Sequence, residues 1–158
     1  MIVSGFRLVH ARFATTIYDG KGAMLCGGRW NSPGMPVVYL AESRSLAILE
    51  TIVHLGSEDT PTGFEMGEAA FDSTFVEVFD PSRLPATWNS ELGSPELKRV
   101  GDDWLAGGTS AVLKVPSVVV PVEFNYLLNP KHPDFFKIRC VQPQPFSIDF
   151  RLWRQLTN

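Results

Sequence analysis

An arginine, a tyrosine and a glutamate fall on three successive predicted elements within residues 27–55, GGRWNSPGMPVVYLAESRSLAILETIVHL. Arg29 carries a planar guanidinium whose paired donors fit a phosphate or a carboxylate. Trp30 is next in the chain and can shield such an ion pair from water, and Asn31 follows. The alternative is an arginine stacked on a tryptophan at a surface turn, an arrangement that is common in proteins. Composition alone favours the surface turn.

Glu50 lies in a predicted helix, LAILETIVHL, that is apolar around most of its circumference. Such a helix is usually buried, and a carboxylate on it must find a partner or face a cavity. His54 follows four residues later and therefore lies on the same side. The simpler interpretation is a structural pair at the rim of the core. We favour a carboxylate facing a cavity, because ionisable groups in unusual environments concentrate at functional sites.

Further polar residues interrupt the β-type segment 110–130, SAVLKVPSVVVPVEFNYLLNP. Ser117 follows a proline at a break in the pattern, and Asn125 lies downstream. No nucleophile elbow surrounds Ser117 and no histidine is placed as its base, which disfavours a hydrolase nucleophile. The hydroxyl is suited either to donating a hydrogen bond to a ligand or to capping a strand.

The glycine-rich residues 20–28 match neither common nucleotide signature. Their GxxxxG spacing is followed by Gly28 and Arg29, where a phosphate-binding loop needs Lys and Ser or Thr, and the third glycine of a dinucleotide fingerprint is missing. These glycines can still let backbone amides approach a phosphate, or they simply make turns. Cys26 and Cys140 are the two cysteines and the three histidines are scattered, so we expect no metal site.

Strands and a few helices must position these residues. Residues 2–13, 36–41, 64–79 and 110–130 have strand patterns, although Pro116 and Pro121 break the last into an edge, a bulge or two strands.

One helix is predicted from a cap at Ser43 or Ser45 to about Leu55, and another over residues 94–108. Residues 15–28 read as a loop or hairpin, and 132–138 and 145–153 as short strands or turns. These elements predict an α+β fold with mostly antiparallel sheets and a few helices.

Composition limits the class of protein. The 158 residues are 44% hydrophobic and 20% charged, which predicts a single globular domain over residues 1–158. The net charge of −3 disfavours a mainly electrostatic nucleic-acid binder. No apolar run reaches membrane-spanning length, and basic residues interrupt the start where a secretory signal needs an apolar core. We therefore expect a cytoplasmic protein with no membrane or nucleic-acid partner.

Taken together, these residues resemble the RES domain, the toxin of a bacterial toxin–antitoxin pair that is named for its arginine, glutamate and serine. Arg29, Glu50 and Ser117 follow that order. The resemblance covers most of the chain through four segments: FRLVHARF, GKGAMLCGGRWNSPGMPVVYLAESRSLAILETIVHL, FDSTFVEVFDPSRLPATW and WLAGGTSAVLKVPSVVVPVEFNYLLNPKHPDF.

The resemblance implies an ADP-ribosyltransferase-like fold, NAD⁺ as the substrate and a helix-turn-helix (Xre-type) antitoxin as the partner. It implies that Glu50 stabilises the positive charge that develops on the ribose. Arg29 would hold a phosphate of NAD⁺, or inorganic phosphate as a co-substrate, and Tyr39 would stack on nicotinamide or ribose. The other residues expected to bind NAD⁺ are Trp30, Asn31, His54, Ser117 and Asn125; of these, His54 would contact the substrate or hold Glu50.

Three functions compete on this evidence. The leading prediction is a toxin that degrades NAD⁺ by phosphorolysis or hydrolysis and so arrests growth. The first alternative is an ADP-ribosyltransferase that modifies a cellular protein. The second is a non-catalytic nucleotide-binding module in which Glu50 is only an anchor at the rim of the core. A toxin that acts on nucleic acid is disfavoured by the net charge.

Overall fold

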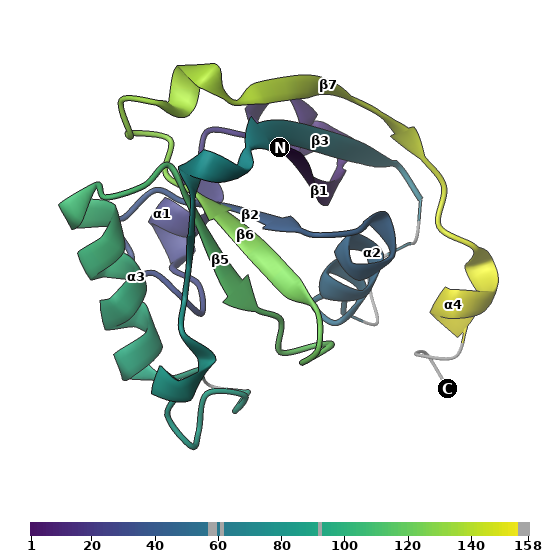
Figure 1. The fold of residues 1–158 in the computed structure, drawn as a ribbon. Helices are drawn as coiled ribbons and strands as arrows, with labels where there is room; N and C mark the ends of the chain where they lie inside the picture. Colours follow the sequence, from purple (N-terminus) through teal and green to yellow (C-terminus); the bar gives the residue numbers. More distant parts are fainter. Residues whose placement is uncertain (57–59, 61, 92, 155–158) are drawn as a thin grey trace.

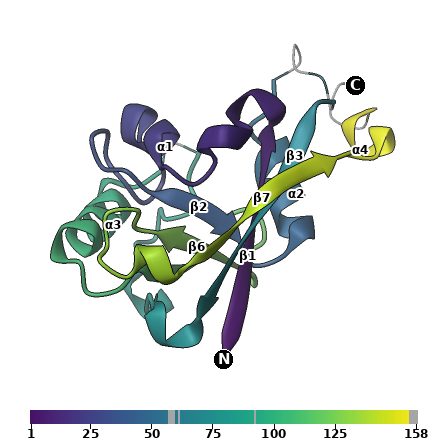
Figure 2. The same cartoon turned by 90° about the horizontal axis from the view of Figure 1, so that it is seen from above.

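A curved seven-stranded sheet forms the centre of the molecule. The computed structural model describes residues 1–56, 60, 62–91 and 93–154. The strand order is β4-β5-β6-β2-β1-β3-β7. Figures 1 and 2 show β1, β3 and β7 passing steeply across β2, β5 and β6. The strands are β1 (Ile2–His10), β2 (Val38–Ala41), β3 (Phe64–Asp72), β4 (Val76–Val78), β5 (Val112–Pro116), β6 (Phe124–Leu128) and β7 (Arg139–Phe146).

The two halves of the sheet meet at the pair β1–β2. These strands are in register through Phe6 opposite Ala41, whereas β1 pairs with β3 along its whole length and β2 pairs with β6 along its whole length. Beyond Phe6 and Ala41 the strands β1 and β2 diverge, because β1 follows β3 and β2 follows β6. The side chains that face the divergence are therefore not covered by a neighbouring strand.

The described residues form four α-helices beside the sheet: α1 (Lys21–Cys26), α2 (Arg44–Ile52), α3 (Pro95–Gly107) and α4 (Phe150–Arg154). Helices α1 and α3 lie at one end of the molecule, and α2 and α4 at the other (Figures 1 and 2). The 3-10 helices are η1 (Ala11–Thr16), η2 (Ser73–Phe75), η3 (Pro81–Arg83) and η4 (Phe135–Lys137).

Local signals explain where α2 begins and where α3 begins and ends. The Ser43 hydroxyl accepts a 3.1 Å hydrogen bond from the Leu46 amide, which satisfies a donor that the first turn of α2 leaves free. Helix α3 begins with Pro95 at its first position and ends at Gly108, whose φ of 57° is left-handed.

The core consists of three apolar clusters. One joins Leu46, Ala47 and Ile52 of α2 to β1 and β3, and a second lies among Val38, Leu40 and the residues of β3, β5 and β6 that face them. The third joins Leu97 and Trp104 of α3 to Trp30 and to strands β5 and β6. Burial of these side chains stabilises the fold by about 25 cal/mol for each Å² of apolar surface removed from water.

The expected α+β class and mostly antiparallel sheet are confirmed, because in the described part of the chain only β4 and β5 pair in parallel. The segment 110–130 forms two strands, β5 and β6, with Pro121 in the loop between them. Two local expectations were wrong, because residues 21–26 and residues 150–154 form helices. Residues 139–146 form an edge strand, for most of which the sequence predicted no element.

Helix α2 is less buried than the sequence predicted. Leu46 is fully buried, whereas Leu49 and Val53 are 39% and 56% exposed, so one apolar stripe of the helix faces solvent. No helix in the described part of the chain combines the length and apolarity needed to cross a membrane.

Candidate active site

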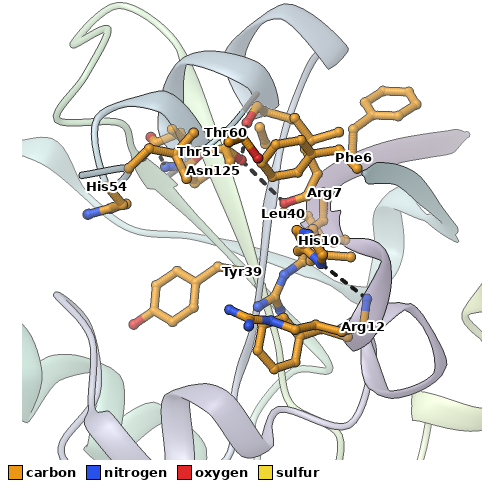
Figure 3. A pocket seen from close by; sticks show the side chains of 18 residues that line it. Phe6, Arg7, His10, Arg12, Tyr39, Leu40, Thr51, His54, Thr60 and Asn125 are labelled. Atoms are coloured by element: carbon orange, nitrogen blue, oxygen red, sulfur yellow. Dashed lines mark hydrogen bonds between the residues drawn. The ribbon is translucent and has the colours of Figure 1, made fainter. Parts of the chain in front are cut away.

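A pocket of about 610 Å³ opens where β1 and β2 diverge (Figure 3). Strands β1 and β2 form its floor, α2 forms one wall, and η1 lies at its rim. A volume of this size falls in the range of small-molecule and cofactor sites. The lining residues with polar or aromatic side chains are Phe6, Arg7, His10, Arg12, Phe13, Tyr39, Glu50, Thr51, His54, Thr60, Phe64 and Asn125.

Glu50 lies on the α2 wall and is held by two donors. The Ser117 hydroxyl donates to Glu50 Oε1 over 2.8 Å, and Asn125 Nδ2 donates to the same oxygen over 2.7 Å. Ser117 follows the end of β5, and Asn125 belongs to β6. The Glu50 carboxylate therefore has one partner from strand β6 and one from the loop after β5, and it also faces a pocket.

Tyr39 contributes its ring to the pocket and its hydroxyl to a separate network. The hydroxyl donates to Asn31 Oδ1 over 2.7 Å and accepts from the Trp30 amide over 3.1 Å. In Figure 3 it points away from the other side chains of the pocket. Burial raises the pKa of the Tyr39 phenol above its usual value, so the group is neutral at physiological pH.

Asn31 is fully buried and holds the turn behind Tyr39. Its Nδ2 donates to the carbonyl oxygens of Ala23, Ser32 and Met35 over 2.9, 3.1 and 3.0 Å. A Cβ on Gly28 would lie 2.6 Å from the Tyr39 hydroxyl, so only glycine leaves room for this network.

Arg29 is absent from the lining of the described pocket. Its Nη1 donates to the carbonyl oxygens of Trp88 and Ser90 over 2.8 and 3.0 Å, which ties the turn to a loop distant in sequence. Trp30 is 3% exposed and packs edge to face against Phe79 with ring centroids 5.0 Å apart. The structure thus places Arg29, Trp30 and Asn31 behind the Tyr39 wall, where they support the pocket from outside.

Arg7 lines the pocket, and sequence reasoning did not select it. The residue is half-buried, and its Nη1 makes a long 3.4 Å hydrogen bond to the Ile17 carbonyl. Burial lowers the pKa of Arg7, while Asp19 opposes that shift. The available signal was a single arginine between Phe6 and Leu8 in a largely apolar strand. An arginine placed in this way is suited to an anionic ligand.

His54 and Arg12 lie at the rim of the pocket and are exposed. No hydrogen bond or ion pair within the described residues joins His54 to Glu50, although the two side chains line the same pocket. Arg12 lies 4.8 Å from the centroid of the Phe13 ring. Within the described residues, no group of three or more His, Cys, Asp and Glu side chains is arranged to hold a metal ion.

Comparisons with known proteins identify sequences similar to this chain. The model of the RES domain family matches residues 5–149. The chain is 38% identical over 148 residues to "Toxin Res" of Photorhabdus laumondii, covering 93% of this chain and 95% of that protein. It is 39% identical over 140 residues to "Prs ADP-ribosylating toxin" of Sphingobium sp., covering 87% of each chain.

Two further comparisons concern mycobacterial proteins. The chain is 31% identical over 111 residues to "NAD(+) phosphorylase MbcT" of Mycobacterium tuberculosis, covering 65% of this chain and 59% of that protein. The crystal structure of the M. tuberculosis MbcT-MbcA toxin-antitoxin complex contains a chain of the same fold. Its TM-score is 0.74 at 16% identity, and the match covers 99% of this chain and 90% of that one.

Proposed function

The chain belongs to the RES domain family, and on that premise we propose that it is a toxin of a toxin–antitoxin pair that cleaves the nicotinamide–ribose bond of NAD⁺. One observation carries the proposal. The Glu50 carboxylate, fixed by two hydrogen bonds, shares a pocket with the guanidinium of Arg7 and the ring of Tyr39. The pocket therefore presents a negative charge, a positive charge and an aromatic face to one ligand.

Glu50 is the proposed catalytic residue. When the glycosidic bond of NAD⁺ breaks, nicotinamide leaves with the bonding electron pair and its ring becomes neutral, while positive charge develops on the ribose. A carboxylate beside the ribose hydroxyls stabilises that charge, as in glycoside hydrolysis. The acceptor then bonds to the anomeric carbon that nicotinamide has left, and it loses a proton if it is water.

Arg7 takes the anion-binding role that the sequence suggested for Arg29. Its guanidinium lies in the pocket, and its hydrogen bond to the Ile17 carbonyl is long. A phosphate of NAD⁺, or an inorganic phosphate co-substrate, would supply the strong charge-assisted bonds that the guanidinium lacks. Arg29 would act indirectly, by holding the turn that supports Tyr39.

Tyr39 would stack on nicotinamide or ribose through its ring, because its hydroxyl is occupied by Asn31 and Trp30. His54, which is exposed at the rim, would contact the distal part of the substrate. Trp30 and Asn31, expected from the sequence to bind NAD⁺, would contribute through the shape of the pocket wall.

The acceptor distinguishes two candidate functions. The similarity to a protein named as an NAD⁺ phosphorylase supports degradation of NAD⁺, with phosphate or water as the acceptor. The similarity to a protein named as an ADP-ribosylating toxin supports a second candidate, transfer of ADP-ribose to a protein. We favour degradation, because Arg7 offers an anion site inside the pocket.

The proposed partner is an antitoxin of the helix-turn-helix type that holds the toxin inactive in the cytoplasm. The similarity of fold to a chain in a toxin–antitoxin complex supports such a partner. Because NAD⁺ itself is the substrate, the activity needs no resident cofactor or metal in this proposal.

The test uses purified protein freed from any antitoxin, incubated with NAD⁺ in the presence and absence of inorganic phosphate. Products are identified by mass spectrometry. ADP-ribose 1″-phosphate formed only with phosphate indicates phosphorolysis, and ADP-ribose formed in both conditions indicates hydrolysis. A parallel incubation with labelled NAD⁺ and cell lysate detects transfer to protein. NAD⁺ that stays intact in all three conditions contradicts the proposed function.

A further inference from the structure

The Ser117 hydroxyl has all its hydrogen-bonding positions filled. Its oxygen accepts from the backbone amides of Val119 and Val120, each over 3.1 Å. A hydroxyl has two acceptor positions and one proton. Since both acceptor positions are used, the proton must go to the remaining neighbour, and that neighbour is Glu50 Oε1 at 2.8 Å. The direction of this hydrogen bond therefore follows from the heavy atoms alone.

Ser117 is also fixed in place by its own loop. Its amide donates to the Glu123 carbonyl over 2.9 Å, and the Glu123 amide donates to the Val120 carbonyl over 2.9 Å. The side chain is fully buried and does not line the pocket. The hydroxyl is therefore a rigid donor that reaches Glu50 from behind and has no route to a ligand.

Asn125 reinforces the same oxygen from a different strand. Its Nδ2 donates to Glu50 Oε1 over 2.7 Å, and the opposite amide orientation would place oxygen against oxygen. In the described part of the chain its Oδ1 is buried without a hydrogen-bond partner. An unpaired buried acceptor is costly, and such groups in native proteins call for a functional explanation. Here the side-chain amide of Asn125 is oriented so that Nδ2 donates to Glu50, and this orientation leaves Oδ1 without a partner in the described residues.

We propose that Ser117 and Asn125 are positioning residues that together hold Glu50 Oε1, so that Oε2 is the oxygen that meets the substrate ribose. This inference rests on the proposed function for the identity of the substrate. It replaces the expectation that Ser117 and Asn125 bind NAD⁺ directly. Oε1 accepts two hydrogen bonds and is saturated, so the carboxylate has one defined rotamer and one available oxygen.

The arrangement predicts a specific kinetic signature. A positioning residue affects the rate at which bound substrate reacts, whereas a substrate contact affects affinity as well. Misplacement of a catalytic group by about 1 Å lowers the rate by about 10²-fold. We expect Ser117→Ala and Asn125→Ala each to lower kcat by about 10-fold to 10²-fold, and the dissociation constant of NAD⁺ to change by less than about 3-fold.

The two variants should also be non-additive, because both act through one oxygen. We expect the double variant Ser117→Ala/Asn125→Ala to lose less activity than the product of the two single losses. Ser94→Ala is the matched control: Ser94 is 1% exposed, lies directly before α3 and is not part of the pocket lining. Its kcat should equal that of the parent, and thermal unfolding shows whether each variant is folded.

Several results would overturn the inference. A folded Ser117→Ala protein with the parent's kcat would overturn it. A Ser117→Ala or Asn125→Ala protein with an unchanged kcat and a raised NAD⁺ dissociation constant would also overturn it. If the parent does not consume NAD⁺, the proposed function fails, and the positioning role is then decided by a crystal structure of the double variant. The role predicts a rotated Glu50 carboxylate in that structure, and an unchanged carboxylate refutes it.

Discussion

The phenol of Tyr39 donates a 2.7 Å hydrogen bond to the side chain of Asn31, which lies eight residues earlier and is fully buried. The same oxygen accepts from the Trp30 amide. One side chain thus presents its ring to the pocket and its hydroxyl to the turn behind it. Substitutions of Tyr39 can therefore remove the hydroxyl, which holds the turn, without removing the ring, which lines the pocket.

Tyr39→Phe should keep activity and lose stability. The change leaves a buried amide and a buried carbonyl oxygen without their partner, which costs about 1–3 kcal/mol. The ring that lines the pocket remains, so NAD⁺ cleavage at a temperature where the variant is folded should stay close to that of the parent. Urea unfolding and initial rates measure the two effects. Tyr39→Ala removes the ring as well and should lose both; equal activity losses in the two folded variants would mean that the hydroxyl takes part in the chemistry.

Arg7→Met should weaken ligand binding without destabilising the fold. Hydrogen bonds to a charged group contribute about 1.5–3 kcal/mol, so NAD⁺ should bind roughly 10- to 150-fold more weakly. Replacing the charge of this half-buried residue, which has one long hydrogen bond, by an apolar side chain should leave the free energy of unfolding equal or higher. Calorimetric titration with NAD⁺ measures the affinity, and urea unfolding measures the free energy of unfolding. Arg12→Met is the control at the exposed rim; if it weakens binding as much as Arg7→Met, the anion site is not at Arg7.

Arg29→Ala should act mainly on stability. It removes two hydrogen bonds to the carbonyl oxygens of Trp88 and Ser90, and we expect a loss of about 1–3 kcal/mol. Under conditions where the variant is folded, its NAD⁺ affinity should fall less than that of Arg7→Met. A variant with the parent's stability and a larger loss of affinity than Arg7→Met would show that Arg29 itself holds the phosphate.

Gly101→Ala should disrupt the contact between α3 and the turn that contains Trp30. A Cβ on Gly101 would overlap the Trp30 carbonyl oxygen, so the helix or the turn must move. Overpacking of this kind costs about 1–3 kcal/mol or more. Gly107→Ala lies on the same helix with its nearest neighbour at 4.0 Å, and should be neutral or stabilising by up to about 1 kcal/mol. Equal thermal stability of the two variants would contradict this packing.

Local signals in the sequence predicted the elements that carry the site. Serine caps and a first-turn proline located the starts of α2 and α3, and runs of β-branched, aromatic and other apolar residues located β2, β5 and β6. Strand β7 was missed because Pro143 and Pro145 break its pattern. Proline is tolerated there because β7 is at the edge of the sheet and pairs only with β3.

The geometry of the site depended on contacts that leave little trace in sequence. Ser117 lies 67 residues from Glu50, and only the family resemblance brought the two together in advance. The partners of Arg29 are backbone carbonyl oxygens, which any residue provides, so its role outside the pocket had no sequence signal. Arg7 was treated as part of a strand pattern because the divergence of β1 and β2, which exposes it to the pocket, is a property of the folded sheet.

If Glu50 makes the pocket an NAD⁺-cleaving site, purified Glu50→Gln protein must consume NAD⁺ more slowly than the parent. The matched control is Glu42→Gln, because Glu42 is also a half-buried carboxylate with a hydrogen-bond donor but does not line the pocket. We predict that Glu50→Gln consumes NAD⁺ at least about 10²-fold more slowly than the parent, while folded Glu42→Gln keeps the parent's rate. A folded Glu50→Gln protein that consumes NAD⁺ as fast as the parent would show that Glu50 is not the catalytic carboxylate.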